Sequence, residues 1–197
     1  MNNNVKIADP GPLGLAAFAL TTFILSLSNA QILPPSLSHL FLTLGLFYGG
    51  GVQVLAGMWE FRNGNTFAAT AFSSYGAFWM SLSAMVYLEL NGILNFGADG
   101  KMAVGTYLVG WTIFTLYMWI GTFRLNRVLN VTFSFLLVTF ILLDLAEFGL
   151  IPSTFGGYFG LITAFCAWYG SAAGVLNPLY RRDILPVGDL SQMKKSA

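Results

Sequence analysis

Residues 66–90, TFAATAFSSYGAFWMSLSAMVYLEL, run from Thr66 to Leu90 with Glu89 as their only charged side chain. At a rise of about 1.5 Å per residue, a helix of this length crosses the roughly 30 Å of hydrocarbon in a bilayer. Other apolar runs of about 18 to 23 residues are Leu13 to Ala30, His39 to Phe61, Ala103 to Phe123, Val128 to Leu150 and Phe155 to Leu176. The sequence therefore predicts an all-α membrane protein with six transmembrane helices.

The composition leaves little material for anything else. Of the 197 residues, 56% are hydrophobic and 9% are charged, and the connections between the runs are short. We expect an N-terminal segment (residues 1–12), a transmembrane domain (13–177) and a polar C-terminal tail (178–197) that is flexible near the lipid headgroups. The net charge of +1 gives no indication of a nucleic acid partner.

The basic residues are distributed unequally between the two sides that six spans define. One side receives Lys101 alone, whereas the other receives Lys6, Arg62, Arg124, Arg127, Arg181, Arg182, Lys194 and Lys195. Because cytoplasmic loops carry the excess of Lys and Arg, this count predicts that both termini of a multi-pass protein of the plasma (inner) membrane are cytoplasmic.

The first apolar run has a second interpretation. Leu13 to Leu27 followed by Ser28-Asn29-Ala30 has the form of a signal peptide core with its cleavage site. Asp9, Pro10 and Pro12 are a poor basic segment to precede such a core, and the charge count already agrees with a retained span. We therefore favour a transmembrane helix here.

Metal and enzyme chemistry have little support in the sequence. Cys166 is the only cysteine and His39 the only histidine, and the two lie far apart along the chain. No nucleophile with a paired base and no phosphate-binding loop is visible. We expect no metal, no cofactor and no catalytic residue.

Two of the predicted helices have a face that is apolar at its centre and polar toward one end. On the first helix this face carries Gly14, Phe18, Thr22, Leu25 and Asn29, and on the fifth it carries Leu129, Thr132, Leu136, Phe140, Leu143 and Glu147. The polar end lies on the external side in both cases. Such faces are typical of helices that border a pathway through a bundle.

The second and third helices show packing faces. Gly49, Gly50, Gln53, Gly57 and Glu60 share one side of the second, which indicates close helix approach with Gln53 as an interhelical hydrogen-bonding group. We expect Glu60 to lie at the membrane surface beside Arg62. Asn65 and Thr66 are expected to cap the third helix, whose small residues face away from Tyr75.

Charged groups are placed at the ends of the runs. Asp144 and Glu147 lie close to Pro152, where they either reach headgroup water or form an external vestibule. No Lys, Arg or His falls in the middle of a span. A substrate would therefore be held weakly, through hydroxyls, amides and helix N-termini, without a titratable relay at mid-membrane.

Three blocks of sequence resemble one known family. Residues 9–15, DPGPLGL, are similar to its signature Asn-Pro-Ala-Pro-Leu-Gly-Leu. The other matching residues are Phe47-Tyr48-Gly49-Gly50, Gln53, Ala56-Gly57, Glu60, Gly64-Asn65-Thr66-Phe67, Thr70, Phe72, Ser74-Tyr75-Gly76, Phe78-Trp79, Val175-Leu176-Asn177 and Leu185-Pro186-Val187-Gly188. The chain thus resembles the acetate uptake transporter family, the succinate-acetate permeases and their fungal relatives.

This resemblance implies a pore within each protomer and a homohexameric assembly. It also implies a hydrophobic constriction, which falls on Phe18, Tyr75 and Leu136 in this sequence. Asp9 departs from the signature Asn and adds a negative charge at the cytoplasmic mouth, and Gly11 replaces the usual Ala.

We therefore expect uptake of small carboxylates, acetate first and succinate second, in contact with membrane lipids and with a proton moving alongside the substrate. The polar residues expected along the path are Thr22, Asn29, Gln53, Asn65, Thr66, Thr132 and Glu147. Two alternatives stay open. One is a channel for a neutral solute such as urea, ammonia or protonated acid, and the other is a membrane sensor or scaffold whose tail binds a partner.

Overall fold

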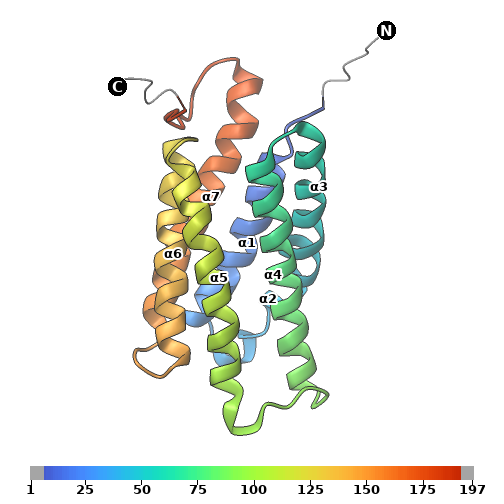
Figure 1. Ribbon diagram of the computed structural model, residues 1–197, viewed down its shortest axis with the longest axis vertical. Coiled ribbons are helices and arrows are strands. Elements are labelled where there is room, and N and C mark those ends of the chain that lie inside the picture. Colours follow the sequence, from blue (N-terminus) through green and yellow to red (C-terminus); the bar gives the residue numbers. More distant parts are fainter. Residues whose placement is uncertain (1–6, 192–197) are drawn as a thin grey trace.

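Long apolar segments fold as helices in a bilayer because only then are their backbone N–H and C=O groups paired within the segment. The computed structural model describes residues 7–191, and Figure 1 shows this part of the chain as an upright bundle. Five of its helices are single rods: α1 (Gly11–Asn29), α4 (Thr66–Leu90), α5 (Gly100–Thr122), α6 (Arg127–Glu147) and α7 (Thr154–Tyr180).

A sixth rod is built from three consecutive pieces. These are α2 (Phe41–Leu46), a π-helical segment (Phe47–Val52) and α3 (Gln53–Asn63). Short 3₁₀ turns at Pro35–Leu37 and Gly97–Asp99 lie in the connections. The prediction of an all-α protein with six long helices is confirmed, and the predicted runs agree with the helices to within a few residues at most ends.

Five of the six rods are long and apolar enough to cross a membrane, and α4 is the exception. The buried side of α4 includes Tyr75, Trp79 and Ser83, which lower its mean hydropathy. These polar groups are tolerated because α4 packs against the second rod and also touches α1 and α5. The chain is a multi-pass membrane protein.

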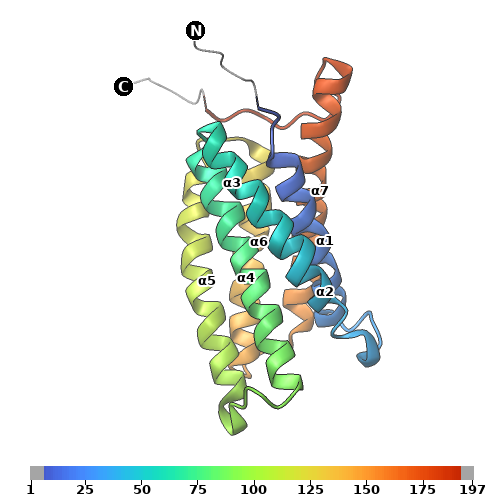
Figure 2. The ribbon, with the colours of Figure 1, turned by 90° about the vertical axis from the view of Figure 1, so that its right-hand side faces the viewer.

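The two ends of the bundle differ. The start of α1 and the end of α7 lie at one end, called here the terminal end, and the connections after α1, α4 and α6 lie at the far end (Figures 1 and 2). Among the described basic residues, Lys101 begins α5 at the far end. Five arginines lie at the terminal end, where they end, follow or begin helices: Arg62, Arg124, Arg127, Arg181 and Arg182. Lys6, Lys194 and Lys195 lie outside the described residues.

Two asparagines begin helices at the terminal end. Asn65 Oδ1 accepts from Ala68 N at 3.1 Å to cap α4, as expected, and Asn126 Oδ1 accepts from Leu129 N at 2.8 Å to cap α6. Gly64, with a φ of +77°, ends α3 and permits the tight reversal into α4. These short, capped turns fix the neighbouring helices in register.

The glycine face of the second rod is buried, as predicted. A methyl group added to Gly49 would overlap the side chain of Thr21 on α1, and one added to Gly57 would overlap Ser73 on α4. The absence of side chains therefore lets three helices approach closely.

The C-terminal segment differs from the prediction of a flexible tail. Residues 184–190, called here the strap, lie across the terminal ends of α6 and α7. Asn177 donates to Leu185 O and accepts from Leu185 N, both at 2.9 Å. Gly188 O in the strap also accepts a hydrogen bond from Arg127 N at 2.8 Å. The flexible-tail prediction is wrong for these residues because their backbone groups pair with helix ends.

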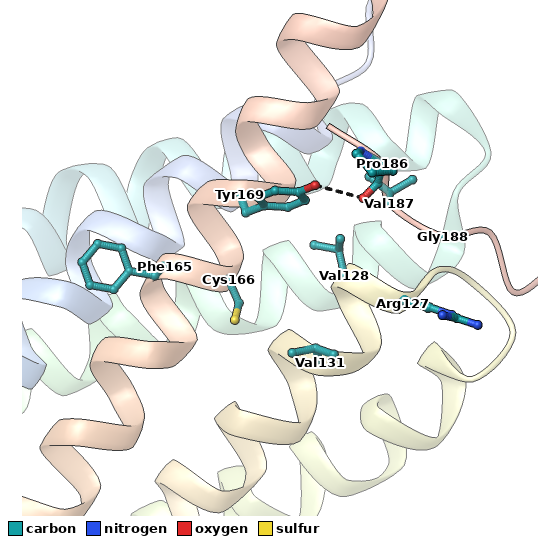
Figure 3. A pocket seen from close by; sticks show the side chains of 9 residues that line it. All are labelled: Arg127, Val128, Val131, Phe165, Cys166, Tyr169, Pro186, Val187 and Gly188. Carbon is teal, nitrogen blue, oxygen red and sulfur yellow. Dashed lines mark hydrogen bonds between the residues drawn. The ribbon is translucent and has the colours of Figure 1, made fainter. Parts of the chain in front are cut away.

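Figure 3 shows the strap from close by. Tyr169 on α7 donates to Pro186 O at 3.0 Å, above an apolar hollow of about 610 Å³ that includes Val131 and Cys166. The last helix was expected to end before the tail that begins at residue 178, but α7 continues through Pro178 to Tyr180. Position 178 lies in the last turn of α7, where a missing N–H disturbs little of the helix.

Candidate transport pathway

The three residues expected to form the constriction lie inside the bundle. Phe18 on α1, Tyr75 on α4 and Leu136 on α6 are 6%, 2% and 4% exposed and belong to one apolar cluster. The rings of Phe18 and Tyr75 are 5.8 Å apart between centroids and tilted by 56°. We call this buried group of three residues the waist.

Tyr75 is held from the side by residues that the sequence analysis did not single out. Its hydroxyl lies 2.8 Å from Thr115 Oγ1 on α5, which is fully buried. Its ring packs edge-on against Phe114 at 5.2 Å and lies 6.1 Å from Phe133. The helical spacing of Trp111, Phe114 and Thr115 was the available signal, but it resembles the pattern of any buried helix face.

A cavity of about 450 Å³ lies between the waist and the far end of the bundle. Phe18 and Leu136 border it, and so do three of the expected path residues, namely Thr22, Asn29 and Glu147. Its wall also includes Trp79. Within the described residues, neither Thr22 Oγ1 nor Trp79 Nε1 has a hydrogen-bond partner, although both atoms are buried. Two residues that line the far cavity therefore carry a buried, unpartnered polar atom.

The two carboxylates near the end of α6 have different surroundings. Glu147 borders the far cavity, whereas Asp144 is not part of its wall. Asp144 Oδ2 instead accepts from Thr112 Oγ1 on α5 at 2.6 Å. Of these two carboxylates, Glu147 is therefore the one that a solute in the far cavity would contact.

A second cavity of about 440 Å³ opens at the terminal end, between α1, α4 and the turn from α5 to α6. Asn65 borders it, although its Oδ1 is occupied by the cap of α4. The charged residues in its wall are Asp9, Glu60 and Arg124.

Glu60 corrects one prediction. It was expected at the membrane surface beside Arg62, but its side chain is 1% exposed and its Oε2 has no hydrogen-bond partner among the described residues. The reason is the face on which it lies, because Glu60 continues the buried glycine face of the second rod and is enclosed by the start of α1 and the turn into α4.

The two cavities lie on one line and do not join. On α1 the terminal cavity reaches Leu15 and the far cavity reaches Phe18, a rise of about 4.5 Å. On α4 they reach Phe72 and Phe78, with Tyr75 between them and bordering neither. The waist is therefore a thin apolar barrier.

Three expected path residues border neither cavity. Gln53 is buried on the packing face of the second rod, and its Oε1 has no hydrogen-bond partner among the described residues. Thr132 donates to Val128 O at 2.7 Å, and Thr66 is exposed at the start of α4. Of the other expected path residues, Thr22, Asn29 and Glu147 border the far cavity and Asn65 borders the terminal cavity.

The arrangement defines a class of protein, a helical membrane bundle with opposed cavities on either side of an apolar waist. Comparison with known proteins agrees with this class. The GPR1/FUN34/yaaH family matches residues 1–191, and the chain belongs to that family.

Individual relatives cover nearly the whole chain. The succinate-acetate/proton symporter SatP of Escherichia coli strain K12 is 39% identical over 188 residues, which cover 94% of this chain and 98% of that protein. A solved structure, that of the bacterial acetate channel SatP, has a TM-score of 0.87 at 39% identity and covers 93% of this chain and 100% of its own. Ammonia transport outward protein 2 of Saccharomyces cerevisiae is 42% identical over 86% of this chain and 62% of that protein.

Proposed function

We propose that this protein carries acetate, and also succinate, across the membrane through a pore within each protomer. The pore consists of the far cavity, the waist of Phe18, Tyr75 and Leu136, and the terminal cavity. The observation that carries this proposal is the alignment of two cavities within one bundle, which the waist separates in the described part of the chain. The names of the relatives support carboxylates as the substrate.

The far cavity offers neutral groups for recognising a carboxylate. Thr22 Oγ1 and Trp79 Nε1 are unpartnered within the described residues, and both residues border this cavity. An indole N–H can only donate, and a hydroxyl can donate to an anion. Weak binding by two such donors suits a substrate that must also leave.

The waist acts as the barrier to free ion flow. An aromatic and aliphatic ring excludes water and ions until its side chains move apart, and it selects by size. Moving one negative charge inward against 100 mV, inside negative, costs about 2.3 kcal/mol, so uptake requires a proton or removal of the product.

We further propose that the terminal end faces the cytoplasm of a cell whose plasma membrane holds the protein. The five described arginines at that end, against Lys101 at the other, support this orientation. We also propose that six subunits assemble as a homohexamer with one pore in each subunit, as the sequence resemblance implies.

A second candidate function is passage of a neutral solute. The apolar waist suits uncharged cargo, and one relative is named for outward transport of ammonia. This alternative makes a different prediction for the far cavity, because an uncharged solute gains less than a carboxylate from two hydrogen-bond donors.

Uptake into proteoliposomes tests both functions. Labelled acetate, succinate and urea are compared in vesicles with and without the protein and with and without a pH gradient, so that leakage of free acetic acid is subtracted. We expect protein-dependent entry of acetate and succinate that saturates and exceeds that of urea. Faster urea entry with no carboxylate entry would establish the neutral channel instead.

A further inference from the structure

The terminal cavity has a charge arrangement that the proposed pathway does not explain. A methyl group built on Gly11 would lie 3.0 Å from Asp9 Oδ1 and 3.4 Å from Glu60 Oε1. The two carboxylates therefore border the same small volume at the start of α1. Asp9 Oδ1 accepts from Gly11 N at 2.8 Å, whereas Glu60 Oε2 has no hydrogen-bond partner among the described residues.

Within residues 7–191, neighbouring groups do not fully neutralise this pair. Among the described residues in the wall of the cavity, the only other charged side chain is Arg124, which has an interaction of its own. Asn63 and Asn65 hydrogen-bond to Glu60 but bring no positive charge, and Arg62 is exposed. Among the described residues, two carboxylates and one guanidinium give the wall of the cavity one net negative charge at the point where an anion would pass.

Burying a carboxylate without a cation beside it costs several kcal/mol, and a second carboxylate nearby adds repulsion. A single proton relieves both costs, because a protonated carboxyl is neutral and can donate a hydrogen bond to its neighbour. Asp9 is exposed and also borders a hollow of about 800 Å³ at the terminal end. It therefore gives a proton from water a route to the buried Glu60.

We propose that Asp9 and Glu60 form a proton-binding site that sets the charge of the terminal cavity. One carboxylate oxygen takes a proton from water in the cavity, which brings the net charge of the wall to zero and admits an acetate or succinate anion. Return of that proton to water restores the negative charge and hinders the next anion. The inference rests on the proposed transport function and adds the group on which the proton acts.

The test compares Asp9→Asn and Glu60→Gln with the native protein and with Glu89→Gln. Glu89 is an exposed carboxylate at the far end and serves as the matched control. Asp9→Asn is a mild change, because an amide oxygen can still accept from Gly11 N and Asn stands in the family signature. Labelled succinate is the probe, since its two carboxylates limit leakage of free acid through lipid.

In the native protein, we expect uptake at equal pH on both sides to be about tenfold faster near pH 5.5 than near pH 7.5. Asp9→Asn and Glu60→Gln should each reduce the ratio of the two uptake rates to near one, with fast uptake at both pH values. Glu89→Gln should keep the native ratio. If both Asp9→Asn and Glu60→Gln keep the native ratio, the proposal is overturned. A flat response in Glu60→Gln alone overturns the shared site, because the proton then belongs to Glu60 by itself.

Infrared difference spectra of the purified protein between the same two pH values provide a readout that does not depend on transport. A carboxylic acid C=O band should be present in the native protein and in Asp144→Asn, and be lost in Glu60→Gln. If Glu60→Gln fails to fold, Asp9→Asn still tests the proposal. An unchanged C=O band and an unchanged ratio of uptake at the two pH values in Asp9→Asn would show that the two carboxylates do not share a proton. Absence of succinate uptake by the native protein would instead contradict the proposed function.

Discussion

Two seams of the bundle are built in opposite ways. Where α1 meets α7 and the second rod, glycines face small side chains, as where Gly160 faces Ser26 and Gly49 faces Thr21. Where α4 meets α5 and α6, rings make the contact. Phe78 on α4 lies within 6 Å of Tyr107 and Trp111 on α5 and of Phe140 on α6, measured between ring centroids.

The difference indicates how the two sides of the pathway behave. A seam of glycine against small residues has no side-chain freedom, so its helices stay at a fixed separation. A wall of rings can change rotamers without moving a backbone. The waist takes Phe18 from the glycine-packed helix and Tyr75 from the aromatic wall, where Thr115 and Phe114 hold its ring.

The largest effect is expected from filling the rigid seam. A Cβ on Gly157 of α7 would overlap the backbone at Ala30, which cannot move aside easily. Gly157→Val should lower stability by roughly 3 kcal/mol or more and prevent recovery of folded protein. Yield and thermal unfolding of the purified protein measure this.

Gly110→Ala is the matched control, since nothing lies within 4 Å of a Cβ at that position. It should raise stability by about 0.5 to 1 kcal/mol because alanine favours the helix. Equal behaviour of the two variants would show that α1 and α7 are not closely packed.

Opening the waist should have the next largest effect. Phe18→Ala removes the ring that faces Tyr75 at 5.8 Å. Uptake of labelled acids longer than acetate should rise about tenfold, because the apolar barrier becomes wider and easier to wet.

Phe23→Ala is the control, because Phe23 lies on the same helix but packs on Phe165 and Trp168 of α7. Its uptake of longer acids should match the native protein. If Phe18→Ala retains native selectivity and rate in correctly inserted protein, the waist is not the barrier.

A smaller effect is expected at the wall of the far cavity. Trp79→Phe keeps a ring but removes the unpartnered indole N–H. We expect the KM for acetate to rise about fivefold with little change in urea entry, which corresponds to loss of roughly one hydrogen bond.

Trp119→Phe is the matched control, because Trp119 Nε1 already donates to Ser134 at 2.8 Å. This variant should lose stability and keep the native KM. An unchanged KM in Trp79→Phe would remove this residue from substrate recognition.

The smallest effect concerns how Tyr75 is held. Tyr75→Phe removes the hydrogen bond with Thr115 and should lower stability by about 1 kcal/mol. A double-mutant cycle with Thr115→Val, followed by thermal unfolding, measures the coupling between the two residues. Additive losses would mean that the hydroxyl does not fix the ring.

The sequence predicted the frame of the molecule well because a bilayer leaves a chain few choices. Six apolar runs had to become helices, the face from Gly49 to Gly57 had to allow close approach, and Asn65 had to cap α4. The positions of Phe18 and Tyr75 followed from the family resemblance, and the structure places both in the interior. Their role in transport stays a prediction.

Other features depended on contacts between segments distant in the sequence. Three such features are the burial of Glu60, the strap beyond Asn177 and the hydrogen bond between Tyr75 and Thr115. Each depends on contact between separate helices or connections. A helical wheel gives the direction of a side chain but not its neighbour. Gln53, Thr66 and Thr132, which were expected along the path, therefore border neither cavity.

By itself, the sequence determined that this chain spans a membrane as six helices, since apolar length and backbone pairing leave no other solution. The tertiary structure alone decided which polar groups lie in the cavities and which lie in packing seams. The physical reason is that burial and pairing of a side chain depend on the helix across from it, and packing sets that relationship only when the bundle closes.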